Sequence, residues 1–267
     1  MKWIKWFVLT AFTCITVVPL LWLLMASFKT NKELFRDPFG LPTEWMYDNY
    51  ASVFDSHPIP LYFYNSVFVA VISTVIALIV STLASYIFIY HFKWKNQWLL
   101  LLTFGILIPT NAFMVPYYFI VDWLGLYDTL FGVALVYAGV SLPLSVIIIK
   151  TYMDTIPYEI VEASFIDGAS IHKTFSRVIL PISYPGIVTA SIFLMITAWN
   201  ELLFANLLTQ SETTRTLQVA IRFFLSTFNA NYPYAFAAMI IAILPTILVY
   251  TFLSEKIIGG LTAGAVK

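Results

Sequence analysis

Residues that could do chemistry are scarce in this sequence, and the polar ones gather in one internal stretch. The segment Glu162–Pro181, EASFIDGASIHKTFSRVILP, is the longest polar interruption in the second half of an otherwise apolar chain. The three histidines, His57, His91 and His172, stand far apart and lack HExxH-like company. The chain also lacks the GxxxxGK motif, followed by Ser or Thr, that cradles ATP phosphates. These residue types indicate a chain that meets a partner rather than one that catalyses a reaction.

The composition suits lipid rather than water. Of the 267 residues, 60% are hydrophobic and 10% are charged, whereas a soluble domain has roughly 25% charged residues. The formal net charge is zero, so no basic footprint for nucleic acid is present. The single cysteine, Cys14, lies in an apolar run and can form neither an intrachain disulfide nor a zinc site. These features exclude a typical soluble enzyme and predict a membrane protein.

Six apolar runs are long enough to cross a bilayer. A membrane helix needs about 20 apolar residues, and the runs are continuous rather than alternating, which favours helices. The first run is too long for the apolar part of a signal peptide, so we expect an uncleaved anchor. Pro109 and Pro116 predict a broken or kinked third span. The expected spans are 6–28, 63–90, 98–121, 130–149, 184–205 and 235–258.

The basic residues predict the orientation. With a cytoplasmic N-terminus, nine Lys and Arg residues fall inside and five outside, which agrees with the positive-inside rule. Both termini and Glu162–Pro181 are then cytoplasmic. Two long segments, 29–62 and 206–234, lie outside, and their role is open. Part of the second segment has apolar residues at the spacing of an amphipathic helix, and the alternative is an ordinary structured loop. These residues are Leu217, Ile221, Phe224, Leu225 and Phe228.

The polar segment carries the signals of two short helices joined at a glycine. Pro157 is typical of a helix first turn, and Glu159 and Glu162 follow near the positive end of that helix. Gly168 can adopt the left-handed conformation that ends a helix, and Ser170 can cap the next one.

Each of these helices has an apolar stripe that must be buried. Either the ends of this chain's own helices cover the stripes, or a groove of a cytoplasmic partner does. The stripes are Tyr158, Val161 and Phe165 in the first helix and Ile171, Phe175 and Val178 in the second.

This segment resembles the EAA loop of bacterial ABC importer permeases, in which Glu-Ala-Ala is followed by three residues, a glycine, nine residues and Ile-x-Leu-Pro. Here the pattern reads Glu162-Ala163-Ser164, then Gly168, then Val178-Ile179-Leu180-Pro181. The residues at 164 and 178 depart from it by near-isosteric changes. The extension Ile166-Asp167-Gly168-Ala169 fits the carbohydrate-importer branch.

Three further motifs are similar to the smaller of the two permease subunits of maltose-type systems. They are Asn65-Ser66 in the second span, Trp199-Asn200-Glu201 in the fifth, and the tail Gly260–Lys267. The resemblance implies an all-α membrane protein with six transmembrane helices and the type I ABC importer permease fold. It implies a single domain, 1–267, with a cytoplasmic EAA coupling loop at 150–183.

The resemblance also implies a mechanism. In this family the EAA loop docks into a cleft on an ATP-binding subunit, whose closure on nucleotide switches the permease from inward- to outward-facing. The implied partners are a second permease subunit in a heterodimer, two cytoplasmic ATP-binding subunits and an extracytoplasmic solute-binding protein, in the bacterial inner membrane. This chain would not be an enzyme and would bind no cofactor itself, because ATP and Mg belong to the ATPase. The tail is expected to reach the ATPase interface. The residues implied in coupling are Glu162, Ala163, Ser164, Asp167, Gly168, Leu180 and Pro181.

Polar residues within the membrane are candidates for contact with a sugar, because they are costly in lipid. Trp199-Asn200-Glu201 offers an aromatic face beside planar polar groups. The alternatives are that Glu201 is solvated at the outer end and that Asn200 bonds a neighbouring helix. The substrate-pathway candidates are Asn65, Ser66, Asn111, Trp199, Asn200 and Glu201.

The rival function is an ion-gradient-driven secondary transporter or channel. It predicts charged residues in mid-span, and the six spans have almost none. The sequence does not identify the sugar.

Overall fold

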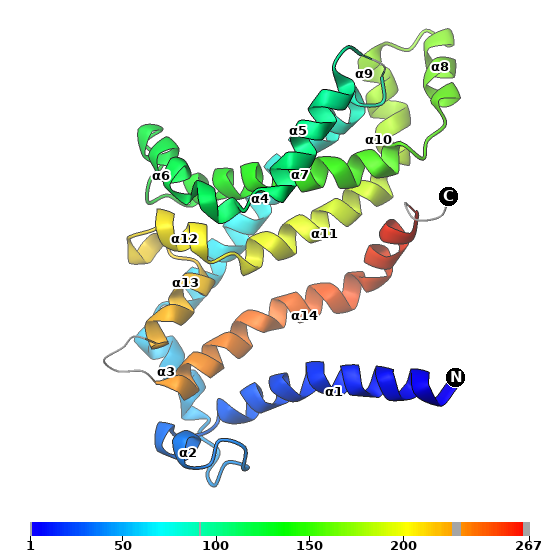
Figure 1. Ribbon diagram of the computed structural model, residues 1–267. Helices are drawn as coiled ribbons and strands as arrows, with labels where there is room; N and C mark the ends of the chain where they lie inside the picture. Colours follow the sequence, from blue (N-terminus) through cyan, green and yellow to red (C-terminus); the bar gives the residue numbers. More distant parts are fainter. Residues whose placement is uncertain (1, 91, 226–230, 264–267) are drawn as a thin grey trace. The chain divides into compact units, whose positions relative to one another are not determined.

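The computed structural model of the chain describes residues 2–90, 92–225 and 231–263. Every regular element within these residues is helical, as predicted (Figure 1). The chain forms two compact units. Unit 1 consists of Met1–Phe63 and Thr216–Ile247, and unit 2 consists of Tyr64–Arg215 and Leu248–Lys267. The single domain expected over 1–267 stays a prediction.

Unit 2 is built on apolar helices that pack through small residues. Its membrane helices are α4 (Ile59–Ile87, which begins in unit 1), α5 (Lys95–Leu107), α6 (Met114–Trp123), α7 (Leu130–Met153) and α11 (Tyr184–Asn200). Ala77 of α4, Ala138 of α7 and Leu194 of α11 share one buried cluster. Gly186 approaches α7 so closely that an added Cβ would lie 2.6 Å from the Tyr152 Cβ. Small residues at these contacts let membrane helices approach closely, as is usual in lipid.

The helix over the third predicted span is broken, as the prolines predicted. Helix α5 ends at Leu107, and a 3-10 turn, η1 (Thr110–Phe113), leads into α6. The two segments are bent by 94° (Figure 1). The break lies at Ile108, whose ψ of 128° is extended, because a following proline disfavours the helical conformation. Pro116, in contrast, lies in the first turn of α6, where its missing N–H is tolerated.

Four helices of the described part are long and apolar enough to cross a membrane, or six if each of two bent pairs forms one span. The pairs are α5 with Thr110–Trp123, and Ile171–Ile182 with α11, which are bent by 94° and 72°. Helix α11 ends at Asn200, inside the predicted fifth span of 184–205, and the bounds of that span stay a prediction. The chain is extended at Glu201, where ψ is 129°, and a short helix, α12 (Leu203–Leu208), follows.

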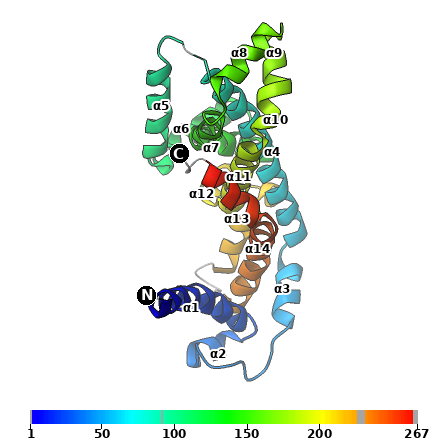
Figure 2. The same cartoon turned by 90° about the vertical axis from the view of Figure 1, so that its right-hand side faces the viewer.

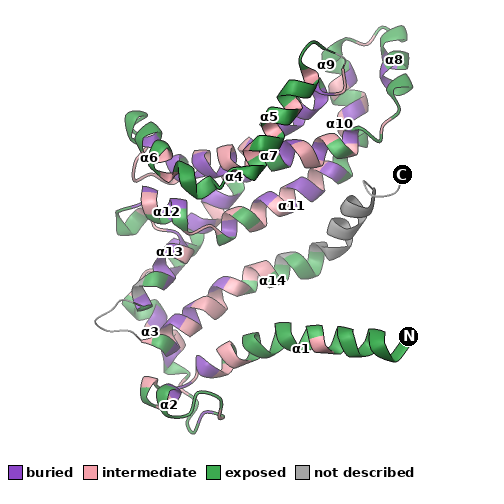
Figure 3. Cartoon of the chain, in the orientation of Figure 1, coloured by how far each residue is buried: buried purple, intermediate pink, exposed green. Residues whose placement is uncertain are grey.

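Unit 1 contains the first helix and part of the predicted outer segments. Its elements are α1 (Lys2–Ala26), α2 (Asn31–Arg36), α3 (Asp48–Ser56), α13 (Leu217–Ile221), η4 (Arg222–Leu225) and the start of α14 (Tyr232–Ala263). Ala26 is the one buried residue of α1, which is otherwise mostly exposed (Figure 3). The segment after α1 is tied to it by the buried Lys29, whose Nζ donates to the Asp37 carbonyl at 2.7 Å. Asn49 Nδ2 donates to the carbonyls of Ser27 and Lys29.

A helix forms where the spacing from Leu217 suggested one. Leu217, Ile221 and Phe224 are buried, whereas Leu225 is exposed. The helical part of the interpretation is confirmed for 217–225, but α13 is buried on most of its sides, because Val219 and Ala220 are buried as well. Phe228, the last residue of that pattern, lies outside the described residues.

Candidate functional site

The predicted coupling loop forms two helical segments at one end of unit 2. They are α8 (Tyr158–Ile166) and a continuous helix made of α9 (Ile171–Thr174), a π-helical turn (Phe175–Ile179) and α10 (Leu180–Ile182). Helices α8 and α9 lie together in both views (Figure 1, Figure 2). Lys150, the first residue of the predicted loop, still lies within α7.

The sequence signals for these helices are confirmed. Pro157 immediately precedes α8. Gly168 has a φ of +79°, and nothing lies within 4 Å of an added Cβ. Its role is therefore conformational, because an L side chain rarely adopts this backbone conformation. The Ser170 side chain caps α9 by accepting a hydrogen bond from the Lys173 N–H.

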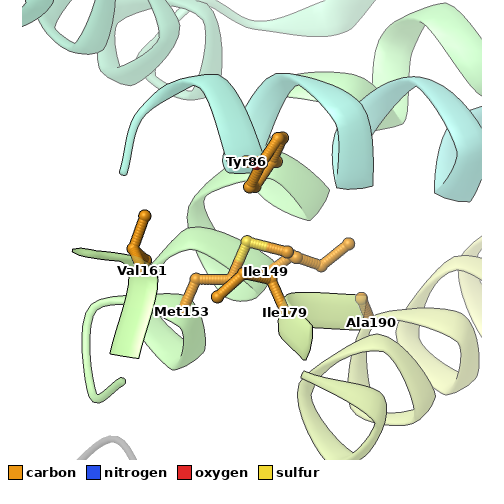
Figure 4. Close-up of a cluster of buried hydrophobic side chains, with 6 residues drawn as sticks. All are labelled: Tyr86, Ile149, Met153, Val161, Ile179 and Ala190. Carbon is orange, nitrogen blue, oxygen red and sulfur yellow. The ribbon is translucent and has the colours of Figure 1, made fainter. Parts of the chain in front are cut away.

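The inner side of the loop is buried against this chain's own helices. Val161 of α8 and Ile179 pack with Tyr86 of α4 and with Ile149 and Met153 of α7, and Ala190 of α11 completes the cluster (Figure 4). The first explanation for the apolar stripes is thus correct for Val161. Phe175 and Val178 also pack on this cluster. Tyr158, Phe165 and Ile171 stay more than a third exposed, so part of each stripe is open.

A buried pair of hydroxyls joins the two helices. Ser164 Oγ lies 2.8 Å from Thr174 Oγ1, and it also donates to the Val161 carbonyl at 2.7 Å. Both side chains are buried. Sequence reasoning treated Ser164 as a near-isosteric change for alanine and missed this bond. The sequence did carry a signal for its burial: Ser164 follows the apolar Val161 by three residues, so the two side chains lie on the same face of the helix.

Two tyrosines of the segment that ends α4 hold the start of α9. The Tyr86 hydroxyl donates to the Ile171 carbonyl at 3.0 Å and is hydrogen-bonded to the Tyr90 hydroxyl. The Tyr86 ring packs on Phe175, with centroids 4.9 Å apart, and the Tyr90 ring lies 6.4 Å from that of Phe165. These contacts attach the loop to a membrane helix, and sequence reasoning did not identify either tyrosine.

The outer side of α8 is a solvent-exposed face of acidic and aliphatic residues. Glu159, Glu162, Ala163, Ile166 and Asp167 are all exposed, and they recur at i, i+3, i+4, i+7 and i+8. Ile166 is 85% exposed. Within the described residues neither glutamate forms an ion pair. We name these five residues the outer face of α8.

The predicted coupling residues divide between the two sides of the loop. Those on the outside could meet a partner, whereas Ser164 supports the loop from within. Glu162, Ala163, Asp167, Gly168 and Pro181 are exposed, Leu180 is half-buried and Ser164 is buried.

Several substrate-pathway candidates have structural partners in this fold. Asn65 is buried, and its amide donates to the carbonyls of Thr213 and Arg215 at 2.9 and 2.8 Å. It therefore fixes the loop after α12 to α4. Ser66 is buried beside it. Asn111 lies exposed on η1 at the break of the third span.

The Trp199-Asn200-Glu201 motif forms the junction between α11 and α12. Trp199 is buried, and exposed Asn200 donates to the Ile196 carbonyl in its own helix. The Glu201 carboxylate accepts from the backbone N–H groups of Leu203, Phe204 and Ala205 at 2.7, 3.0 and 3.2 Å. It thus caps α12, where a negative charge is favourable.

A further acid, Asp128, anchors the loop that follows α12. Its φ is +55°, and its carboxylate accepts from the N–H groups of Gln210 and Ser211 and from the hydroxyls of Ser211 and Thr214. Burial alone would raise the pKa of Asp128, but these hydrogen bonds to the charged form outweigh it and lower the pKa to about 2. Sequence reasoning did not identify this role of Asp128.

The comparisons with known proteins agree with this architecture. Residues 77–258 match the family described as binding-protein-dependent transport system inner membrane component. A putative ABC transporter permease protein of Caldicellulosiruptor sp. is 36% identical over 267 residues, covering 98% of this chain and 97% of that one. A trehalose transport system permease protein of Mycobacterium tuberculosis is 32% identical, covering 94% and 92%.

A solved structure shares the fold. It is a crystal structure of a bacterial ABC transporter involved in the import of the acidic polysaccharide alginate, with a TM-score of 0.82, 21% identity and 95% of each chain covered. The chain therefore belongs to the family of inner-membrane permease components of binding-protein-dependent ABC transporters.

Proposed function

We propose that this permease imports a sugar or oligosaccharide and that the outer face of α8 is where the ATPase attaches. The observation that carries the proposal is the two-sidedness of α8. One side is fixed to the chain's own helices through Val161 and Ser164, and the other presents Glu162, Ala163 and Ile166. Alternating access driven from outside the membrane requires such a handle, which is rigid toward the permease and open toward a partner.

The contacts of the loop define how force reaches the membrane helices. A pull on α8 passes through the Ser164–Thr174 hydroxyl pair to α9. From α9 it passes through the Tyr86 hydroxyl to α4, and the cluster around Ile149 and Met153 connects the same loop to α7. Closure of the ATPase dimer would therefore move α4 and α7 together.

The partners and the topology follow from this proposal. A second permease subunit, two ATP-binding subunits that hold ATP and Mg, and an extracytoplasmic binding protein complete the transporter, and both termini are cytoplasmic. The tail Gly260–Lys267 would approach the ATPase, but its residues 264–267 lie outside the described residues. His91, one of the three histidines of the sequence, also lies outside them. Membership of the permease family argues against the ion-gradient-driven rival.

The carbohydrate assignment rests on the relatives and on the candidate residues. One relative is named for trehalose transport, and the ABC transporter whose structure has the same fold is involved in the import of alginate. Among the candidates, Asn111 and Asn200 have exposed side chains and could touch a sugar directly. Asn65, Ser66, Trp199 and Glu201 would support the pathway by holding its elements in place.

Purification of the whole transporter with its binding protein and ATPase tests the proposal. Reconstituted in liposomes, the complex should take up a neutral or acidic oligosaccharide only when ATP is supplied on the ATPase side. Uptake by the permease alone, or uptake that continues without ATP, would contradict the proposed function.

The coupling role has its own test at Gly168. Gly168→Val should strain the left-handed backbone by about 1–2 kcal/mol and reduce both ATPase attachment and transport. Gly168→Asn is the matched control, because asparagine tolerates this conformation. Equal transport by the wild type and the valine variant would remove this glycine from the coupling mechanism.

A further inference from the structure

The two ends of the coupling loop meet at a close contact between α7 and α11. The chain leaves α7 at Met153 and enters α11 at Tyr184, and these two helices pack together within unit 2 (Figure 1). Just inside the two ends, Tyr152 of α7 lies against the buried Gly186 of α11. A Cβ at position 186 would lie 2.6 Å from both the Cβ and the Cγ of Tyr152. The helices are therefore as close here as a residue without a side chain allows.

This close approach cannot be relieved by turning a side chain. Carbon atoms in ordinary contact lie about 3.5–4.0 Å apart, and the Cβ of Tyr152 is held in place by the backbone of α7. Gly40 and Gly132 also lack room for a Cβ, but the atoms that crowd them belong to preceding residues of their own segment. At Gly186, in contrast, the missing side chain sets the distance between two membrane helices.

The backbone that joins the loop to α11 is kinked. The segment Ile171–Ile182 is bent by 72° from α11, and the bend lies at Ser183, whose ψ of −3° departs from the helical value of about −42°. Pro185, in the first turn of α11, has no N–H to donate across the bend. The Ser183 N–H donates to the Ile179 carbonyl at 2.8 Å, and the Ile187 N–H donates to the Ser183 carbonyl at 3.1 Å. Because a kink interrupts the hydrogen-bond ladder of a helix, a tertiary contact is needed to make α11 follow the loop closely.

We propose that the contact between Tyr152 and Gly186 closes the base of the coupling loop and makes α7 and α11 move together when the ATPase acts on α8. The inference rests on the proposed function and adds two positioning residues to it. The loop is connected to α7 by the buried cluster that contains Met153. The close contact passes the same movement to α11, which ends at Asn200, one of the substrate-pathway candidates.

A role in coupling can be separated from a role in packing alone. Small residues let membrane helices approach closely whether or not the helices move. Packing alone affects the free energy of unfolding of the transporter. Coupling affects how much solute crosses the membrane for each ATP hydrolysed, so the ratio of uptake to hydrolysis is the quantity to measure.

The experiment uses the complete transporter reconstituted in liposomes with its binding protein and ATPase. The radiolabelled probe is whichever of trehalose, maltotriose and an alginate trisaccharide the wild-type complex takes up best. Gly186→Ala should push the end of α11 away from α7 by about 1 Å, the difference between 2.6 Å and an ordinary carbon contact. We expect ATP hydrolysis to continue while uptake per ATP falls by about three- to tenfold, as single mutations can change the coupling between distant sites.

Two further variants isolate the contact. Gly139→Ala is the matched control, because Gly139 also lies in α7 but an added Cβ there has nothing within 4 Å, and this variant should keep the wild-type ratio. Tyr152→Gly opens a gap instead of adding an atom and should also lower the ratio. Combined with Gly186→Ala, it places one small side chain between the helices from the opposite side, and the ratio should recover toward that of the wild type. If Gly186→Ala does not assemble with the ATPase, Tyr152→Gly tests the same contact.

The inference and the proposed function fail in different ways. A wild-type ratio in Gly186→Ala and in Tyr152→Gly would refute the inference, even if their melting temperatures fall. An equal loss in Gly139→Ala, or a double variant that is worse than both single variants, would also refute it. A wild-type complex that takes up none of the three probes with ATP would instead refute the proposed import of a carbohydrate.

Discussion

Thr174 donates its hydroxyl hydrogen to Ser164, because the Ser164 hydroxyl hydrogen is already used on the Val161 carbonyl. The two oxygens lie 2.8 Å apart, and Ser164 Oγ lies 2.7 Å from that carbonyl. Both side chains are buried, but the direction of these bonds means that losing one residue has a different effect from losing the other. Ser164 keeps a partner if Thr174 is lost, but Thr174 keeps none of these bonds if Ser164 is lost.

This asymmetry predicts that Ser164→Ala is more harmful than Thr174→Val. The alanine variant leaves a buried hydroxyl unsatisfied, at about 1–3 kcal/mol, whereas replacing both partners is nearly neutral. Thermal unfolding of the purified transporter should therefore rank Ser164→Ala lowest, with the double variant above it. Ser176→Ala, which loses only a local bond to the His172 carbonyl, is the control. A double variant less stable than Ser164→Ala would contradict the assignment.

The hydroxyl of Tyr86 predicts a loss of coupling without a loss of the fold. Tyr86→Phe keeps the ring contact with Phe175 but removes the bonds to Ile171 and Tyr90. We expect ATP hydrolysis to continue while the sugar moved per ATP falls severalfold, because α9 is no longer tied to α4. The measurement is the ratio of uptake to hydrolysis in proteoliposomes. Tyr90→Phe, which leaves the Tyr86–Ile171 bond in place, should give a smaller fall; an equal fall would contradict this role of Ile171.

Local signals were sufficient for much of this architecture. The break before Pro109, the positive φ of Gly168 and the cap at Ser170 were predicted because each depends on a residue and its immediate neighbours. The helical class followed from continuous apolar runs, and the family from the spacing around Glu162.

The remaining features depend on contacts between distant residues. Asn65 binds the carbonyls of Thr213 and Arg215, 148 and 150 residues away, and Tyr86 binds Ile171, 85 residues away. No local pattern reports such pairs, because the partners are backbone carbonyls that any residue type could supply. For the same reason the sequence marked Asn65 only as a polar residue in the membrane.

Asp128 predicts an acid-sensitive loop. Its pKa is lowered from the ordinary 3.8 to about 2, so its hydrogen bonds stabilise the folded state above about pH 4 and are lost as pH falls toward 2. Asp128→Asn should remove this part of the pH dependence while tolerating the φ of +55°. Melting temperatures from pH 7 down to pH 3 should therefore fall more steeply for the wild type than for the variant. Parallel curves would show that Asp128 titrates normally.

Variants of Glu201 distinguish a role in capping α12 from a role in binding sugar. If it acts as the cap of α12, Glu201→Gln keeps an oxygen acceptor for the N–H groups of Leu203 and Phe204 and should be mild. Glu201→Ala should cost about 1 kcal/mol of stability, as loss of a helix cap does. Asn200→Leu is the companion variant, because its amide is exposed and bonds only the Ile196 carbonyl one turn earlier among the contacts seen here. The melting temperature of the purified transporter reports the capping role of Glu201, and its sugar affinity reports a role in sugar binding. A Glu201→Gln variant with normal stability and at least tenfold weaker sugar binding would identify Glu201 as a substrate ligand instead.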